Sequence, residues 1–136
     1  MTLVAVPVRY PLTRHSRATL AEAISIADKN AADLIVLHID LYHNSGQVTR
    51  SMLKDEVESE FGVLSDTRYT VRRGLLVEES ILEEIAAEDA DIVVVGKKQV
   101  SRWRAMVKRL VDNPNIEQYL RDELDCQVVT AVTDSA

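Results

Sequence analysis

The chain has 136 residues, a length that predicts a single domain over residues 1–136 with a sizeable core. Its apolar content is typical of a soluble globular protein, no apolar run approaches the ~20 residues of a membrane span, and the single cysteine, Cys126, excludes a disulfide framework or a thiolate metal cluster. The net charge of −6 argues against general nucleic-acid binding, while the lone cysteine and an N-terminus without a signal-peptide pattern predict a cytoplasmic protein.

Strand and helix patterns alternate along the first half of the chain. The valine-rich run LVAVPV, residues 3–8, is typical of a strand buried on both faces of a parallel sheet. Ser16 is a suitable N-cap for the helix that follows, because its hydroxyl oxygen can accept a hydrogen bond from a free amide of the first turn. A second buried strand is predicted at residues 33–39, with a loop over DLYHNSG, and residues 49–61 have the spacing of an amphipathic helix.

The second half repeats the alternation. Residues 66–74 have the pattern of a half-exposed strand, residues 77–90 that of a helix, and residues 91–96 that of a buried strand. A short helix over NIEQYLRDEL and a last strand over CQVVTAV, residues 126–132, complete the chain. Strands that alternate with helices predict an α/β fold, with a five-stranded parallel sheet sandwiched by helices in a Rossmann-like arrangement.

Positive charge gathers in two short segments of this acidic chain. Residues 1–17 carry +3 with no carboxylate, residues 97–109 carry +6, and the rest of the chain therefore carries −15. The two basic segments follow the first and the fourth predicted strand, whose carboxyl ends flank the point where strand order reverses and ligands bind in open parallel sheets. We expect one rim of the sheet to collect Arg9, Arg14, His15, Lys97, Lys98 and Arg102.

Several residues of these segments have two interpretations. Gly96 suits either a tight turn after a buried strand or the close approach of a phosphate to the backbone. Lys97 and Lys98 are either a solvated pair or contacts for a phosphate or another anion. The later basic residues are compatible with the polar face of a helix, in which we interpret Trp103 as packed rather than as a platform for a base. We also interpret His38, at the end of the second strand, as a packed and hydrogen-bonded histidine.

Catalytic constellations are not found in the sequence. It contains no nucleophile elbow, no P-loop, no pair of carboxylates placed for acid–base chemistry and no metal-ligand spacing among its histidines. We therefore expect a protein that is not an enzyme and binds no metal, with slow ATP hydrolysis as the alternative.

Taken together, these segments resemble the universal stress proteins. The resemblance extends nearly end to end and is most specific in VEESILEEIAAEDADIVVVG, residues 77–96, which is similar to the family's third helix and fourth strand. The second strand ends in the histidine usual for the family, here His38. The resemblance implies a five-stranded parallel sandwich of the adenine nucleotide alpha hydrolase-like type, a role in stress responses, a homodimer formed through the last strand and, in many members, bound ATP.

The glycine motif of the ATP-binding members is degenerate here. Those members carry G-x2-G-x9-G-[ST] after the fourth strand, and this chain keeps only Gly96, with Gln99 at the second position. The third position falls at Arg109 by strict spacing, or at Asn113 when the following helix is aligned, and Arg9 stands where the family has an acidic residue near the nucleoside. The site residues that we predict for a ligand are Arg9, Gly96, Lys97, Lys98, Gln99 and Asn113.

Three functions follow from these observations. The first is a regulatory module that binds a small anion or an acidic protein partner and is not an ATP binder of the glycine-motif type. The second is a nucleotide-binding protein, for ATP or AMP, with slow or no hydrolysis. The third is a dimeric interaction module without a small ligand. Loss of glycine favours the first and third, and basic clustering favours the first and second. The cofactor is not identified by the sequence, and ATP or another phosphate-containing anion is compatible with it.

The C-terminal strand also predicts an oligomeric state. CQVVTAV has no charged residue, and a free apolar edge of this kind would invite aggregation. We therefore expect this strand to pair with its copy across a two-fold axis and form a homodimer.

Overall fold

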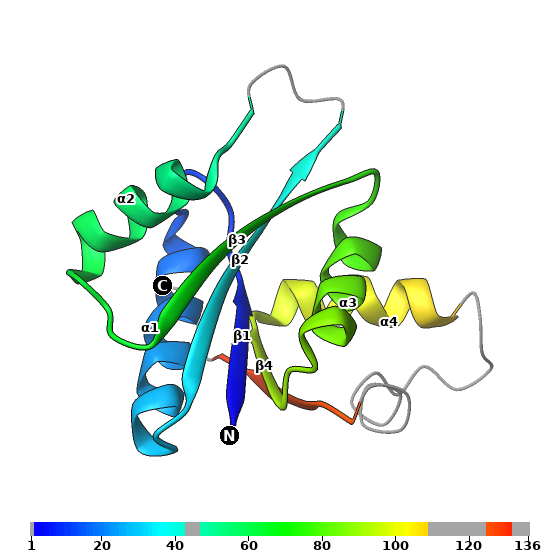
Figure 1. Ribbon diagram of the computed structural model, residues 1–136. Helices are drawn as coiled ribbons and strands as arrows, with labels where there is room; N and C mark the ends of the chain where they lie inside the picture. Colours follow the sequence, from blue (N-terminus) through cyan, green and yellow to red (C-terminus); the bar gives the residue numbers. More distant parts are fainter. Residues whose placement is uncertain (1, 43–46, 109–124, 132–136) are drawn as a thin grey trace.

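The computed structural model describes residues 2–42, 47–108 and 125–131, in which strands and helices alternate along the chain (Figure 1). The strands are β1 (Leu3–Pro7), β2 (Asp33–Leu41), β3 (Thr67–Gly74), β4 (Ile92–Val95) and β5 (Gln127–Thr130). The helices are α1 (Arg14–Lys29), α2 (Arg50–Phe61), α3 (Val77–Glu88) and α4 (Lys97–Lys108).

The strands form one sheet in the order β3-β2-β1-β4-β5, and every neighbouring pair is parallel. The predicted α/β fold with a five-stranded parallel sheet is therefore confirmed. The chain winds outward from the central β1 to β2 and β3 on one side, and from β4 to β5 on the other. Strand order thus reverses between β1 and β4, where the crossover loops diverge and leave room for a ligand.

Alternation of side chains along each strand divides the core between the two faces of the sheet. Val4 and Val6 of β1 face α1 and α2, whereas Ala5 faces α3 and α4. Figure 1 shows α1 and α2 on one side of the sheet and α3 and α4 on the other. The first face packs against Leu20, Ala23, Leu53 and Val57, and the second against Ile81, Ile85 and Trp103.

Two predicted boundaries are wrong by a few residues. Thr13, not Ser16, is the N-cap of α1, and its hydroxyl oxygen accepts a hydrogen bond from the amide of Ser16. Strand β2 runs to Leu41 and includes Asp40, both of which were expected in a loop. The strand is longer because β2 and β3 stay in register as far as the Leu41–Gly74 pair, so that backbone pairing continues past the apolar run.

The basic segment after β4 forms a helix from its first residue onward. Helix α4 begins at Lys97, and its apolar positions Val100 and Trp103 are buried against the sheet and α3. Trp103 is 0% exposed, so its interpretation as a packed residue is confirmed. The predicted helix over residues 115–124 and the predicted site residue Asn113 lie outside the described residues.

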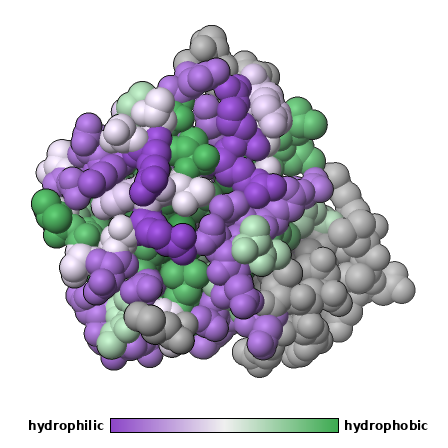
Figure 2. All heavy atoms as spheres, viewed as in Figure 1, coloured by the Kyte–Doolittle hydropathy of each residue, from purple (hydrophilic) through white to green (hydrophobic). Residues whose placement is uncertain are grey.

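The face of the molecule seen in Figure 2 is mostly polar. Figure 2 shows hydrophilic side chains over most of one face, with hydrophobic ones in small separate groups. The most exposed large apolar side chains of the described residues are Val63 and Leu75. Among the described helices, none combines the length and the apolar character that are needed to cross a membrane.

Candidate functional site

A cleft of about 760 Å³ opens at the carboxyl edge of the sheet, where strand order reverses. The ends of β1, β2 and β4 line it from below, and the first turns of α1, α3 and α4 form its walls. All three helices therefore direct their N-terminal ends toward this region, which favours a negatively charged ligand because the free amides at a helix start carry partial positive charge.

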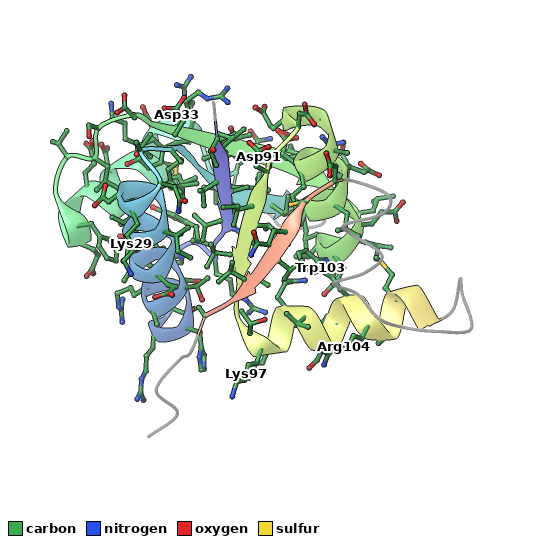
Figure 3. The ribbon with its side chains drawn as sticks, turned by 90° about the horizontal axis from the view of Figure 1, so that it is seen from below. Lys29, Asp33, Asp91, Lys97, Trp103 and Arg104 are labelled. Atoms are coloured by element: carbon green, nitrogen blue, oxygen red, sulfur yellow. The ribbon has the colours of Figure 1, made fainter. Side chains whose placement is uncertain are left out.

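The cleft brings both basic segments together. Arg9 comes from the β1–α1 loop, whereas Lys97, Lys98 and Arg102 come from the first turns of α4. Arg9 and the two lysines are exposed, and Figure 3 shows Lys97 extending outward from the N-terminal end of α4. The grouping that the sequence predicts is thus present, except that Arg14 is not among the residues that line the cleft.

Most of these cationic side chains are not paired with a carboxylate in the described part of the chain. Over the described part of the chain, Arg9, Lys97 and Lys98 form no ion pair with a carboxylate. Arg102 forms one, through its Nε and the Oε1 of Glu78, at 3.9 Å. Cationic side chains that converge in a concave site raise the local potential even when the net charge of the protein is negative.

The start of α4 adds free amides to the cleft. The carbonyl of Gly96 accepts hydrogen bonds from the amides of Gln99 and Val100, at 3.1 and 3.2 Å. The amides of Lys97 and Lys98 precede this first intrahelical bond, and a glycine before them offers no side chain that would cap the helix. These two amides are therefore available to an anionic oxygen.

Gly96 is not required by the chain's own packing. Its backbone is not in the left-handed region, and an added Cβ would lie 3.6 Å from the Oγ1 of Thr19, which is an ordinary van der Waals contact. A turn that forbids larger residues is therefore ruled out as the reason for this glycine. The close approach of a ligand to the backbone of Gly96 stays a prediction.

Helix α1, in contrast, caps one of its N-terminal amides with a side chain. Thr13 Oγ1 accepts from the amide of Ser16, and Ser16 Oγ in turn accepts from the amide of Arg9, at 2.9 Å. Ser16, which is buried, thus holds the backbone of Arg9 against the first turn of α1 while the guanidinium side chain stays exposed. Ser16 is part of the site for this reason, a role that its prediction as a helix cap did not include.

His38 joins β2 to β1 at the rim of the cleft. Its Nδ1 lies 3.0 Å from the carbonyl oxygen of Val8, so the proton of the neutral ring belongs on Nδ1, and the ring of Tyr10 packs edge-on with centroids 6.2 Å apart. The amide of Val8 donates to the carbonyl of Leu37 at 2.8 Å, which extends the strand pairing next to this contact. The interpretation of His38 as a packed, hydrogen-bonded residue is confirmed, and the residue also lines the cleft.

Glu78 is a site residue that the sequence analysis missed. It lies in the first turn of α3, where carboxylates are common because they interact favourably with the helix dipole, so its position alone gives no sign of a ligand. Its carbonyl oxygen accepts a hydrogen bond from Trp103 Nε1 at 3.2 Å, and its carboxylate faces Arg102. Figure 3 shows Trp103 on the side of α4 that faces the sheet.

The rest of the lining is apolar and offers little catalytic chemistry. Ile39, Leu41, Val77, Ile81 and Val95 form the side of the cleft below α3. In residues 2–42, 47–108 and 125–131, no group of three or more histidine, cysteine or acidic residues is arranged to hold a metal ion. The arrangement can thus bind an anion at its cationic edge and an apolar group beside it.

Comparisons with known proteins identify the fold. No protein-family model and no curated protein sequence matches the chain. Solved structures do match it, among them a universal stress protein in complex with cAMP, with a TM-score of 0.58 and 18% identity over 98% of each chain. The universal stress protein UspA from Lactobacillus plantarum matches with a TM-score of 0.57 and 17% identity, over 96% of this chain and 97% of its own.

A universal stress protein from Archaeoglobus fulgidus is a further match, with a TM-score of 0.59 and 13% identity over 97% of this chain and 94% of its own. The chain therefore has the universal stress protein fold, as its resemblance to that family implies. At these identities the likeness is one of fold, and the ligand has to be argued from the residues of the cleft.

Proposed function

We propose that this protein is a regulatory binding module with the universal stress protein fold, whose basic cleft binds a small phosphate-like anion. The observation that carries the proposal is the convergence of Arg9, Lys97 and Lys98, without internal counter-charge, on the two free amides at the start of α4. Charge-assisted hydrogen bonds from such groups are the usual means of holding phosphate or sulfate. The absence of a steric reason for Gly96 supports a ligand that approaches the backbone there.

Binding of ATP in the manner of the glycine motif is disfavoured by Gln99. Its side chain lies in the first turn of α4 and lines the cleft, where a second glycine would expose the backbone. The Nε2 of Gln99 is buried and has no hydrogen-bond partner among the described residues. Loss of two or three charged hydrogen bonds of about 1–3 kcal/mol each would be enough to abolish micromolar affinity for a triphosphate.

A nucleotide monophosphate is the second candidate. The cleft of about 760 Å³ exceeds the needs of an inorganic anion, and its apolar side below α3 is suited to a base. The structural neighbour that was solved with cAMP supports this candidate. In both cases we propose binding without turnover, because among the described residues that line the cleft no hydroxyl is hydrogen-bonded to a general base.

Regulation by assembly is part of the proposal. Strand β5 lies at one edge of the sheet, and Val128 and Val129 are only half-buried there. Pairing of β5 with its copy in a homodimer would cover these residues, and an acidic partner could reach the cationic edge of the cleft. A cytoplasmic role in a stress response agrees with this picture.

Isothermal titration calorimetry tests the proposed function. Inorganic phosphate, cAMP and magnesium ATP are titrated into the protein at low and moderate salt, and we expect phosphate or cAMP to bind more tightly than ATP, with affinity falling as salt rises. The variant Lys97→Ala/Lys98→Ala should lose most of the binding.

The matched control is Lys29→Ala/Lys54→Ala. It removes the same charge from exposed lysines of α1 and α2 that do not line the cleft. An equal loss of anion affinity in both double variants would show that affinity depends only on net charge, and would contradict the proposal. Tight binding of ATP would contradict the assigned ligand class.

A further inference from the structure

One carboxylate, that of Glu78, lies among the cations of the cleft. Glu78 projects from the first turn of α3, and the Oε1–Nε distance to Arg102 of α4 is 3.9 Å. Both residues line the same cleft as Lys97 and Lys98. In an anion site a carboxylate is unexpected, because it repels the ligand that the surrounding cations attract.

The backbone of Glu78 is fixed, so the carboxylate cannot withdraw with its helix. Trp103, which is fully buried, donates its indole N–H to the carbonyl oxygen of Glu78 at 3.2 Å. Helices α3 and α4 are thereby joined at the position where Glu78 enters the cleft. The side chain itself retains freedom, since the pair with Arg102 is long, has no hydrogen bond and leaves 26% of the Glu78 side chain exposed.

The chemistry of a carboxylate decides which anions tolerate it. An ionised carboxylate only accepts hydrogen bonds. Sulfate has no proton to donate at neutral pH, so the Glu78 carboxylate repels it and no hydrogen bond offsets the repulsion. Inorganic phosphate and hydroxyl-bearing phosphoesters carry an O–H group, which can donate to Glu78 while the other oxygens accept from Lys97, Lys98 and the amides of α4.

We propose that Glu78 is the specificity residue of the cleft, selecting phosphate-type anions that carry an O–H donor and rejecting fully deprotonated anions such as sulfate. This inference rests on the proposed function, because it concerns the ligand of the same site. Arg102, whose Nε lies 3.9 Å from Glu78 Oε1, keeps the carboxylate near the cations of the cleft.

The test compares inorganic phosphate with sulfate by calorimetry at one pH and one ionic strength, in the wild type and in two variants. The wild type should bind phosphate about tenfold more tightly than sulfate, the worth of one charge-assisted hydrogen bond. Glu78→Gln should raise the affinity for sulfate and bring the ratio close to one, because the amide offers a donor and no charge. Its backbone bond to Trp103 does not depend on the changed atoms.

Glu79→Gln is the matched control. Glu79 is also in the first turn of α3 and exposed, yet it does not line the cleft, so this variant should keep the wild-type ratio. The same change of the phosphate-to-sulfate affinity ratio in both variants would show that the ratio depends only on net charge, and would overturn the role of Glu78.

Two further outcomes separate this inference from the proposed function. Equal binding of phosphate and sulfate to the wild type, with both weakened in Lys97→Ala/Lys98→Ala, would leave the anion site standing and overturn the selection by Glu78. Absence of phosphate and sulfate binding in the wild type and in Glu78→Gln would overturn the proposed function and the selection together. Thermal unfolding of each variant verifies that the fold is retained.

Discussion

Replacement of Trp103 tests whether the basic segment is a packed helix, on which the geometry of the cleft depends. The indole is 0% exposed, lies among Ile81, Ile85 and Val100 in the core, and donates to the carbonyl of Glu78. Truncation of a buried tryptophan to alanine costs about 3–5 kcal/mol, from lost burial and the cavity that remains. Domains of this size have a total stability of roughly 5–15 kcal/mol, so Trp103→Ala should be severely destabilised.

Trp103→Phe separates packing from hydrogen bonding. Most of the aromatic volume is kept, but the carbonyl of Glu78 loses the indole donor, and a hydrogen bond of this kind is worth about 0.5–1.5 kcal/mol. We therefore expect a loss of stability clearly smaller than that of the alanine variant. The joint between α3 and α4 should loosen as well, so the anion affinity of Trp103→Phe should fall even where the protein is fully folded.

Urea denaturation followed by far-UV circular dichroism measures these free energies, with midpoints compared at constant slope. Ser101→Ala, at an exposed position of the same helix, is the control and should stay within about 0.5 kcal/mol of the wild type. A loss below about 1 kcal/mol in Trp103→Ala would show that α4 does not pack against the sheet and would refute the description of the cleft.

Three further predictions concern the glycine, the sheet edge and the cysteine. Gly96→Ala should fold with a stability within about 1 kcal/mol of the wild type, because the Cβ has room, yet bind phosphate more weakly by calorimetry; unchanged affinity would contradict ligand approach at Gly96. Val129→Lys should convert a dimer to monomers in size-exclusion chromatography with light scattering, and a wild type already monomeric at high micromolar concentration would refute pairing through β5. Burial, with a smaller contribution from Asp91, raises the pKa of Cys126 to about 11 from an ordinary value of 9.0, so the thiol disfavours ionisation in the folded state. Its contribution to stability is complete below pH 9 and lost as pH rises toward 11, and a thiol reagent at pH 8 should label the unfolded protein much faster than the folded one; equal rates would contradict burial.

Local patterns in the sequence predicted the strands and their parallel arrangement. The apolar runs around Val4, Val36 and Val94 are buried on both faces, and such runs between helical segments have few other solutions than a parallel sheet. The placement of Arg9 and the two lysines at one rim followed from the same topology, because carboxyl ends of parallel strands share an edge. Whether the predicted residues bind a ligand stays a prediction.

Only the tertiary structure decided which side chains face the cleft. Strand β2 extends through Asp40 because β3 offers it a backbone partner, and the hydroxyl of Ser16 accepts from the amide of Arg9 while Thr13 caps α1. These outcomes depend on partners from other segments, which a periodic pattern does not record.

Glu78 is the clearest example of this limit. The residues around Glu78 have the pattern of an ordinary first helical turn. Arg102, 24 positions later, has the pattern of a residue on the polar face of a basic helix. The two meet because Trp103 packs against α3 and fixes the angle at which the helices approach. The sequence by itself determined that positive charge collects at the carboxyl edge of a parallel sheet. The packing of α4 on α3 decided that a carboxylate lies among those charges. The direction in which a side chain enters a shared cleft depends on how two elements dock, and not on either element alone.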